Sequence, residues 1–148
     1  MQAVILAAGE GSRMRPLTYT RPKVMLPIAN KPILEHLLIE VVKAGIREFI
    51  FIVGYRDEQV RQYFGSGDRW GVSIDYCTQR KQLGTADAIR MVEGLVDGNF
   101  LAINGDIIVS QKDIQSLINK KNNTMSVIEV EETQDLGLVE LAEGKVVH

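Results

Sequence analysis

The sequence has little of what marks secreted, membrane or nucleic-acid-binding proteins. Cys77 is the only cysteine among the 148 residues, so disulfide bonds are excluded and a reducing compartment, the cytoplasm, is expected. No apolar run approaches the roughly 20 residues of a membrane span, and no charged-then-apolar leader precedes the first apolar segment, so no membrane partner is expected. The formal net charge is only −2, which offers no broad basic face for nucleic acid.

Proline is also scarce, and its four occurrences all lie in one segment, at Pro16, Pro22, Pro27 and Pro32. Because each proline fixes φ, the segment from residue 14 to residue 31 is not expected to form one regular element. The same segment is locally cationic. Between residues 9 and 31 there is a single acid, Glu10, against five cations: Arg13, Arg15, Arg21, Lys23 and Lys31.

The residues just before this segment are small. Positions 7, 8, 9, 11 and 12 are Ala, Ala, Gly, Gly and Ser, so a ligand can approach the main chain without meeting large side chains. Amides exposed in this way, with cations beside them, favour phosphate groups. We therefore expect a polyphosphate to bind in the loop that follows the first apolar segment, Gln2 to Ala7.

Two well-known phosphate motifs do not fit this loop. The pattern GxxxxGK[ST] requires Lys-Ser or Lys-Thr directly after a glycine, and no such pair occurs in the chain. The dinucleotide pattern GxGxxG begins with Gly9 and Gly11, but Met14 stands at its third glycine. The acid that such proteins carry at the end of the second strand is also missing, because Val53, Gly54 and Tyr55 stand there. A nicotinamide-linked oxidoreductase is therefore a distant alternative.

Hydrophobic periodicity predicts alternating strands and helices along most of the chain. This order predicts an α/β fold with a doubly wound, mostly parallel sheet, helices on both faces and ligands at the carboxyl ends of the strands. We expect one domain, because 45% hydrophobic content over 148 residues suffices for one core. The predicted strands are Gln2 to Ala7, Glu48 to Val53, Val72 to Cys77, Asn99 to Ile103, Thr124 to Glu131, Gly137 to Leu141 and Lys145 to His148; the predicted helices are Ile33 to Ala44, Asp57 to Phe64, Thr85 to Leu95 and Gln111 to Lys121.

Two further polar sites follow predicted strands. Gln79 offers an amide that can pair with the imide edge of a pyrimidine, and Gly84 and Thr85 open the next helix; a polar turn capped by Thr85 is the simpler alternative. Asp106 follows the strand that ends at Ile103. It is either a turn former or a hard oxygen ligand of the kind that Mg²⁺ requires.

The cationic loop resembles, over its full length, the signature of the nucleoside-triphosphate:sugar-1-phosphate nucleotidyltransferases. A strand runs into L-A-A-G-x-G-S-R-M-x-P-L-T from Leu6 to Thr18, and P-K-x-M-L-P-I-x-x-K-P follows from Pro22 to Pro32. The resemblance implies a three-layer, Rossmann-like mixed sheet of the nucleotide-diphospho-sugar transferase type. It also implies transfer of a nucleotidyl group from a nucleoside triphosphate to a sugar-1-phosphate, which gives an NDP-sugar and pyrophosphate.

The same resemblance implies roles for individual residues. Arg13 and Lys23 would be catalytic cations, and Asp106 would hold Mg²⁺. Gly137, in the segment D-L-G-L-V-E that begins at Asp135, would lie against the sugar, although Leu136 replaces the family's common aromatic residue. The nucleotide would be bound by Leu6, Ala7, Ala8, Gly9, Gly11, Ser12, Arg13, Gln79, Gly84 and Thr85.

Several choices stay open. Gln79 favours UTP or dTTP over GTP, but Ile107, where many thymidylyltransferases have Asn, argues against choosing the thymidine branch. A mannose-1-phosphate guanylyltransferase and a non-catalytic, regulatory nucleotide-binding module of the same fold are the alternatives. The resemblance covers about the first two thirds of the family's catalytic domain, so residues 1–148 are expected to form its nucleotide-binding portion. The exposed apolar surface that this would leave favours a homo-oligomer.

Overall fold

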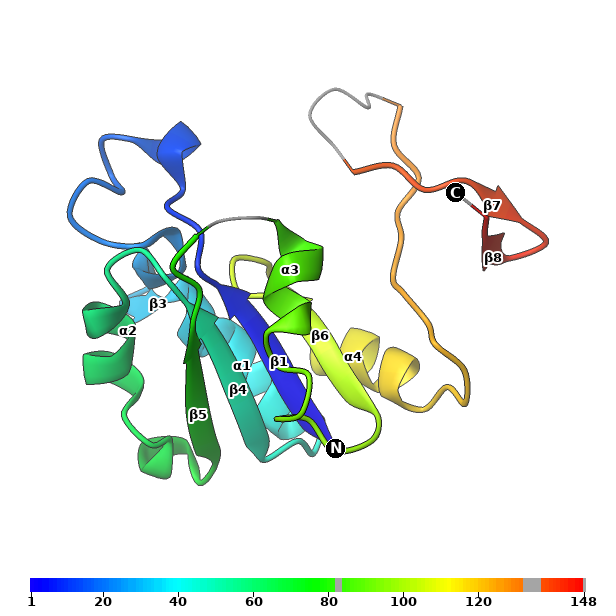
Figure 1. Cartoon of the computed structure of the whole chain (residues 1–148), viewed down its shortest axis with the longest axis horizontal. Coiled ribbons are helices and arrows are strands. Elements are labelled where there is room, and N and C mark those ends of the chain that lie inside the picture. Colours follow the sequence, from blue (N-terminus) through cyan, green and yellow to red (C-terminus); the bar gives the residue numbers. More distant parts are fainter. Residues whose placement is uncertain (82–83, 132–136, 148) are drawn as a thin grey trace.

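A computed structural model describes residues 1–81, 84–131 and 137–147. At its centre is a parallel sheet of four strands: β1 (Gln2–Ala7), β4 (Glu48–Val53), β5 (Ser73–Thr78) and β6 (Phe100–Asn104). The strand order is β5-β4-β1-β6, so the chain builds outward from β1 first on one side and then on the other (Figure 1). All four strands therefore end at the same edge of the sheet.

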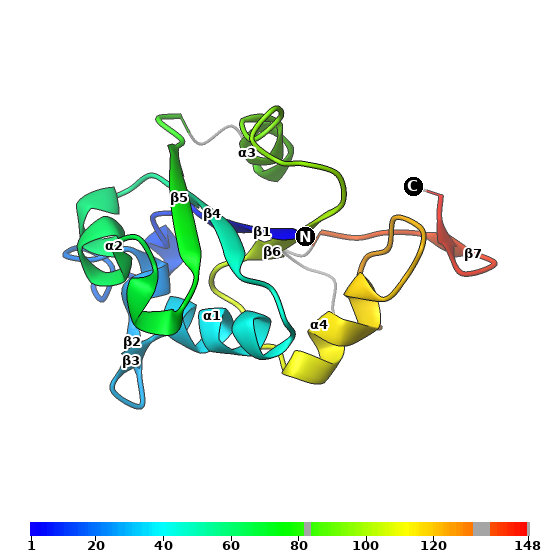
Figure 2. The same cartoon turned by 90° about the horizontal axis from the view of Figure 1, so that it is seen from below.

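Helices cover both faces of this sheet, as Figure 2 shows. On one face α1 (Ile33–Lys43), α2 (Asp57–Phe64) and α4 (Gln111–Ile118) share a core with the inward side chains of the strands. On the other face lies α3 (Thr85–Arg90), which contributes Ala88 to a smaller cluster. β4 alternates between the two clusters and is buried on both sides, which explains its unbroken apolar sequence EFIFIV. The predicted three-layer α/β fold is confirmed.

The first helix shows how the sequence sets an element's limits. Pro32 precedes α1 and suits a helix start, and Leu34, Leu37, Leu38 and Val41 recur at helical spacing on its buried face. The helix ends where Gly45 takes a φ of +102° and its amide returns to the carbonyl of Val42. Glycine takes this left-handed conformation without the steric cost of a Cβ atom.

Four predicted elements differ from the structure, and the simplest case is the helix predicted from Gln111 to Lys121, which ends at Ile118. The helix predicted from Thr85 to Leu95 ends at Arg90, because residues 92, 93 and 95 bond carbonyls only three residues back and Gly94 has a φ of +86°. The strand predicted at Thr124 to Glu131 does not form, and of the strand predicted at Gly137 to Leu141 only Leu141 is in a strand, β7 (Leu141–Ala142), which pairs with β8 (Lys145–Val146). The apolar side chains of both segments are mostly exposed, and no described strand pairs with residues 124–131 or 137–140. Alternation alone does not make a strand, because its backbone groups need a partner.

The remaining elements are short. Two 3₁₀ helices, Ser12–Met14 and Lys23–Met25, and the two-residue strands β2 (Pro27–Ile28) and β3 (Lys31–Pro32) break the proline-rich segment as expected. A third 3₁₀ helix, Asp68–Trp70, precedes β5. Near the end of the chain β7 (Leu141–Ala142) and β8 (Lys145–Val146) pair across the predicted turn at residues 143 and 144. Within the described ranges, no helix has the length and apolarity that a bilayer crossing requires.

The start of α4 predicts an acid-sensitive step in stability. Asp113 accepts from the Ser110 amide at 3.0 Å and Glu40 accepts from the Gln111 amide at 2.8 Å. Hydrogen bonds with Ser110 lower the pKa of Asp113; those with Lys43 and then Gln111 lower the pKa of Glu40. The stability that these two carboxylates contribute is present above the ordinary carboxyl pKa of about 4. It is lost as the pH falls through their lower pKa values in the folded protein.

We therefore expect Asp113→Asn to flatten the loss of thermal stability between pH 5 and pH 3, about the range set by ordinary carboxyl pKa values. Circular dichroism melts at each pH measure this effect. Asp75→Asn, at an exposed position on β5, should follow the parent chain. A parent-like acid limb in Asp113→Asn would mean that the cap contributes nothing to stability.

Candidate functional site

A cavity of about 610 Å³ opens where the strand order changes direction. β1 lies between β4 and β6, and the connections that leave toward these two strands run on opposite faces of the sheet. Such a switch point leaves a crevice at the carboxyl ends of the strands. The cavity is lined there by residues that follow β1, β5 and β6 and by the start of α3.

Close backbone contacts form the base of this cavity. The amide of Gly105 donates to the carbonyl of Leu6 at 2.9 Å, and that of Tyr55 donates to the carbonyl of Ala8 at 3.3 Å. Gly54 lies so near that an added Cβ would stand 2.9 Å from the carbonyl oxygen of Ala8 and 3.1 Å from that of Gln79. The ends of β1, β4 and β5 can meet only because residue 54 has no side chain.

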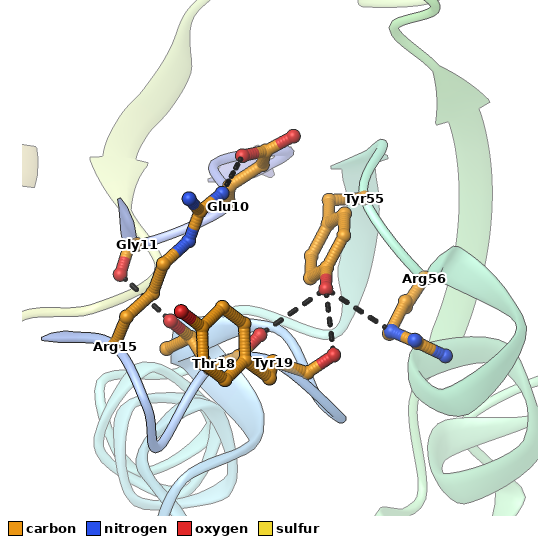
Figure 3. Close-up of polar contacts among 7 residues, drawn as sticks. All are labelled: Glu10, Gly11, Arg15, Thr18, Tyr19, Tyr55 and Arg56. Carbon is orange, nitrogen blue, oxygen red and sulfur yellow. Dashed lines mark hydrogen bonds and ion pairs between the residues drawn. The ribbon is translucent and has the colours of Figure 1, made fainter. Parts of the chain in front are cut away.

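The loop after β1 has internal supports of its own. Gly11 has a φ of +66°, and an added Cβ there would stand 2.7 Å from Cβ of Lys23, so this glycine is required by conformation and by space. The Thr18 hydroxyl donates to the carbonyl of Gly11 at 2.8 Å, and Arg15 pairs with Glu10 at 3.2 Å (Figure 3). The glycine-rich start and the cationic part of the loop are thus folded against each other.

Tyr55, which follows β4, ties the loop to the body of the protein. Its hydroxyl lies 2.9 Å from the carbonyl of Tyr19 and 3.2 Å from that of Thr18, and it accepts from Nε of Arg56 at 3.1 Å (Figure 3). The hydrogen bond with Tyr55 raises the pKa of Arg56. One turn along, the Gln59 amide donates to the carbonyl of Thr20 at 2.7 Å. Neither Tyr55 nor Gln59 was identified from the sequence.

The charged groups of the cavity come from distant parts of the chain. The ammonium of Lys23 lies 2.6 Å from Oδ2 of Asp106, and both side chains are about one-third exposed, at 34% and 32%. Arg13 also lines the cavity, is exposed, and makes no ion pair with any described residue. The cavity therefore offers two cations and one carboxylate to a ligand.

On the other side of the cavity lies Gln79. Its main-chain N–H donates to the carbonyl of Val53 at 2.8 Å, which continues the pairing of β5 with β4 by one residue. Its side chain is buried. The side-chain nitrogen donates to Oδ2 of Asp87 at 3.2 Å. Asp87 is on α3 and does not itself line the cavity.

Most of the residues predicted for the site lie together in this cavity. Ser12 is exposed and does not line it, because it begins a 3₁₀ turn beside the opening, and Gly137 also lies outside it in an exposed segment. The predicted segments include Gln82, Leu83, Asp135 and Leu136, which are outside the described residues. The predicted residues that line the cavity are Leu6, Ala7, Ala8, Gly9, Gly11, Arg13, Lys23, Gln79, Gly84, Thr85 and Asp106; those not predicted are Met14, Val24, Ile52, Ala88 and Asn104.

Comparison with known proteins now decides the family. The family model of the nucleotidyl transferases matches residues 2–148. The chain belongs to this nucleotidyl transferase family. It is 38% identical to the bifunctional protein GlmU of Methanococcus maripaludis, over all of the chain and 34% of that protein. It is 44% identical to the UTP–glucose-1-phosphate uridylyltransferase AglF of Haloferax volcanii, over 73% of the chain and 44% of that protein.

Solved structures agree with this assignment. A Bacillus anthracis protein assigned as a glucose-1-phosphate thymidylyltransferase superposes with a TM-score of 0.74 at 31% identity, over 82% of this chain and 52% of that one. A UDP-glucose pyrophosphorylase in complex with UDP-glucose gives a TM-score of 0.66 at 26% identity, over 80% and 53%. The nucleotidyl transferase chain thus spans about a third to a half of the length of these relatives.

Proposed function

We propose that the protein to which this chain belongs transfers a nucleotidyl group from a nucleoside triphosphate to a sugar-1-phosphate, with residues 1–148 as the nucleotide-binding portion. The observation that carries the proposal is one cavity that combines the glycine-rich loop, Arg13 and the Lys23–Asp106 pair. Both reactants are polyanions, so positioning and charge neutralisation would supply most of the acceleration.

The reaction would be an in-line displacement at phosphorus. An oxygen of the sugar phosphate forms a bond to the α-phosphorus, the bond from that phosphorus to the bridging oxygen breaks, and pyrophosphate leaves with the electron pair. Lys23 has three N–H donors and can hold Asp106 and phosphate oxygens together. Arg13, exposed at the mouth, would neutralise the charge that develops on pyrophosphate. Main-chain groups of residues 8–11 would lie along the phosphates.

The residues present fit a magnesium ion that arrives with the nucleotide. Among the described residues no cluster of three or more His, Cys, Asp or Glu side chains could form a metal cage. Mg²⁺ in nucleotide enzymes is commonly held by one or two carboxylates together with substrate phosphates and water, and Asp106 lines the cavity as such a carboxylate. Bound there, Mg²⁺ would withdraw charge from the phosphoryl oxygens.

For the base, we propose uracil or thymine. Gln79 lines the cavity, and its amide can pair with both the carbonyl oxygen and the N–H of an imide edge. A guanine nucleotide is the second candidate, because a mannose-1-phosphate guanylyltransferase of Mycobacterium tuberculosis is 35% identical over 94% of the chain.

Calorimetric titration with five nucleoside triphosphates in the presence of Mg²⁺ tests the proposal. We expect UTP or dTTP to bind more tightly than GTP, ATP or CTP, and Gln79→Ala to remove most of the preference over ATP and CTP. GTP binding as tight as UTP binding would overturn the choice of base. Absence of binding by all five would overturn the nucleotide site.

Two coarser properties complete the proposal. A cytoplasmic location rests on the single cysteine. A homo-oligomer rests on large apolar side chains that are exposed in the last described segments, such as Ile128 at 83% and Leu138 at 61%. Light scattering over a range of protein concentrations measures the oligomeric state. The mass of a monomer at every concentration would contradict the proposed homo-oligomer.

Tyr55→Phe should weaken nucleotide binding. The substitution removes only the hydroxyl that holds the carbonyls of Thr18 and Tyr19, so the loop that carries Arg13 loses a support while the ring stays in place. One lost hydrogen bond of this kind corresponds to about a threefold to tenfold rise in the Kd for UTP. Calorimetry measures this Kd.

Tyr76→Phe is the matched control, because it removes a hydroxyl that donates to the carbonyl of Gly65, outside the cavity. Equal effects of the two substitutions would mean that Tyr55 has no special link to the site.

A further inference from the structure

The side-chain amide of Gln79 is held in one orientation by α3. Its nitrogen donates to Oδ2 of Asp87 at 3.2 Å, and the other oxygen of Asp87 lies 3.6 Å from Nη2 of Arg90. An ionised carboxylate has no hydrogen to donate, so it can pair with the amide nitrogen of Gln79 and not with the amide oxygen. Rotating the amide by 180° would place two acceptors against each other.

This fixed orientation matters for the hydrogen-bonding edges of the bases. Uracil, thymine and guanine each present a ring N–H beside a carbonyl oxygen, whereas cytosine and adenine present a ring nitrogen acceptor beside an amino group. A glutamine whose orientation is set can match only one of these two patterns. One N–H of the Gln79 side-chain amide is donated to Asp87. The second N–H remains for a carbonyl oxygen of the base, and the amide oxygen remains for a ring N–H of the base.

We infer that Asp87 is a specificity-determining residue. It positions the Gln79 side-chain amide so that the site accepts bases with a ring N–H beside a carbonyl oxygen and rejects cytosine and adenine. This inference rests on the proposed nucleotide function. Asp87 acts through Gln79, because Asp87 does not line the cavity and Gln79 does. The backbone of Gln79 is fixed by its bond to Val53, so the remaining freedom that Asp87 removes is in the side chain.

Asp87→Asn tests the inference with almost no change of shape. An asparagine can accept from the Gln79 nitrogen or donate to the Gln79 oxygen, so either orientation of the amide becomes satisfied. Loss of a negative charge near a polyanion should strengthen binding of all triphosphates alike, and therefore the comparison uses the ratio of the Kd values for CTP and UTP. We expect this ratio to fall by about tenfold, mainly through tighter CTP binding.

Two further variants separate orientation from other causes. Asp87→Glu keeps the carboxylate and should retain most of the discrimination between UTP and CTP. Asp57→Asn is the matched control, because Asp57 also pairs with an arginine of its own helix, Arg61 at 2.8 Å, but contacts neither Gln79 nor the cavity. It should leave the Kd ratio unchanged. General loosening of the site would raise both Kd values and leave their ratio as it was.

Calorimetry of UTP and CTP with Mg²⁺ on the parent chain and the three variants gives distinct outcomes. The inference is supported if the ratio of the Kd for CTP to the Kd for UTP falls in Asp87→Asn and in neither of the other two variants. A parent that discriminates and an Asp87→Asn variant that discriminates equally well overturn the role of Asp87 and leave the proposed function standing. A parent that binds the two nucleotides equally overturns base reading by Gln79, and a parent that binds neither overturns the proposed function; the inference fails in both cases.

Discussion

Lys23→Ala is expected to lower nucleotidyl transfer in the full-length protein by about 10²- to 10³-fold, the usual cost of removing one group that stabilises charge in a transition state. Two effects combine. The substitution removes an ammonium that can reach phosphate oxygens in the cavity, and it leaves Asp106 without the partner that now lies 2.6 Å away. Both side chains are partly exposed, so the fold should survive. Release of pyrophosphate at saturating substrates measures turnover.

Two controls make the result interpretable. Lys43→Ala removes an ammonium that also lies 2.6 Å from a carboxylate, that of Glu40, but outside the cavity, and it should keep normal turnover. Lys23→Arg keeps the charge and changes its shape, so partial activity is expected. If Lys23→Ala turned over at a near-normal rate with an unchanged thermal midpoint, Lys23 would have no part in the reaction.

Much of the fold could be predicted because its signals are local. The run EFIFIV and the spacing of Leu34, Leu37, Leu38 and Val41 each define an element within one short segment, and β4 and α1 formed at almost the predicted limits. The segment from Thr124 to Glu131 gave an equally clear pattern and formed no strand. A strand depends on a distant partner for its hydrogen bonds, and a local pattern carries no information on that partner.

The same distinction applies to the site. The glycines and alanines of the loop and its cations Arg13 and Lys23 could be predicted, because glycine, small side chains and cations in one loop favour phosphate. Asp106 could be predicted only through the family resemblance, because a single acid after a strand is otherwise either a turn former or a metal ligand. Tyr55, Gln59 and Asp87 could not. They are ordinary polar residues in the sequence, and their importance lies in contacts with Thr18, Thr20 and Gln79 that arise only when β4, α2 and α3 are packed.

Gly54→Val is expected to lower both stability and nucleotide affinity, because residue 54 stands where three strand ends meet below the cavity. A Cβ there would lie 2.9 Å from the carbonyl oxygen of Ala8 and 3.1 Å from that of Gln79, and backbone atoms cannot move aside as a flexible side chain can. Overpacking of this kind typically costs about 1 to 3 kcal/mol of stability. Since Ala8 and Gln79 both line the cavity, the displacement should also raise the Kd for UTP.

Urea unfolding and calorimetry on the same samples measure the two effects of Gly54→Val together. Gly137→Val is the matched control, because Gly137 is exposed, lacks a positive φ, and has no described atom within 4 Å of an added Cβ. It should leave the free energy of unfolding and the Kd for UTP unchanged. Gly54→Ala adds the same Cβ without the two methyl groups and should fall between the parent and Gly54→Val. Parent-like stability and affinity in Gly54→Val would show that the ends of β1, β4 and β5 can separate without cost, and that their close approach does not shape the cavity.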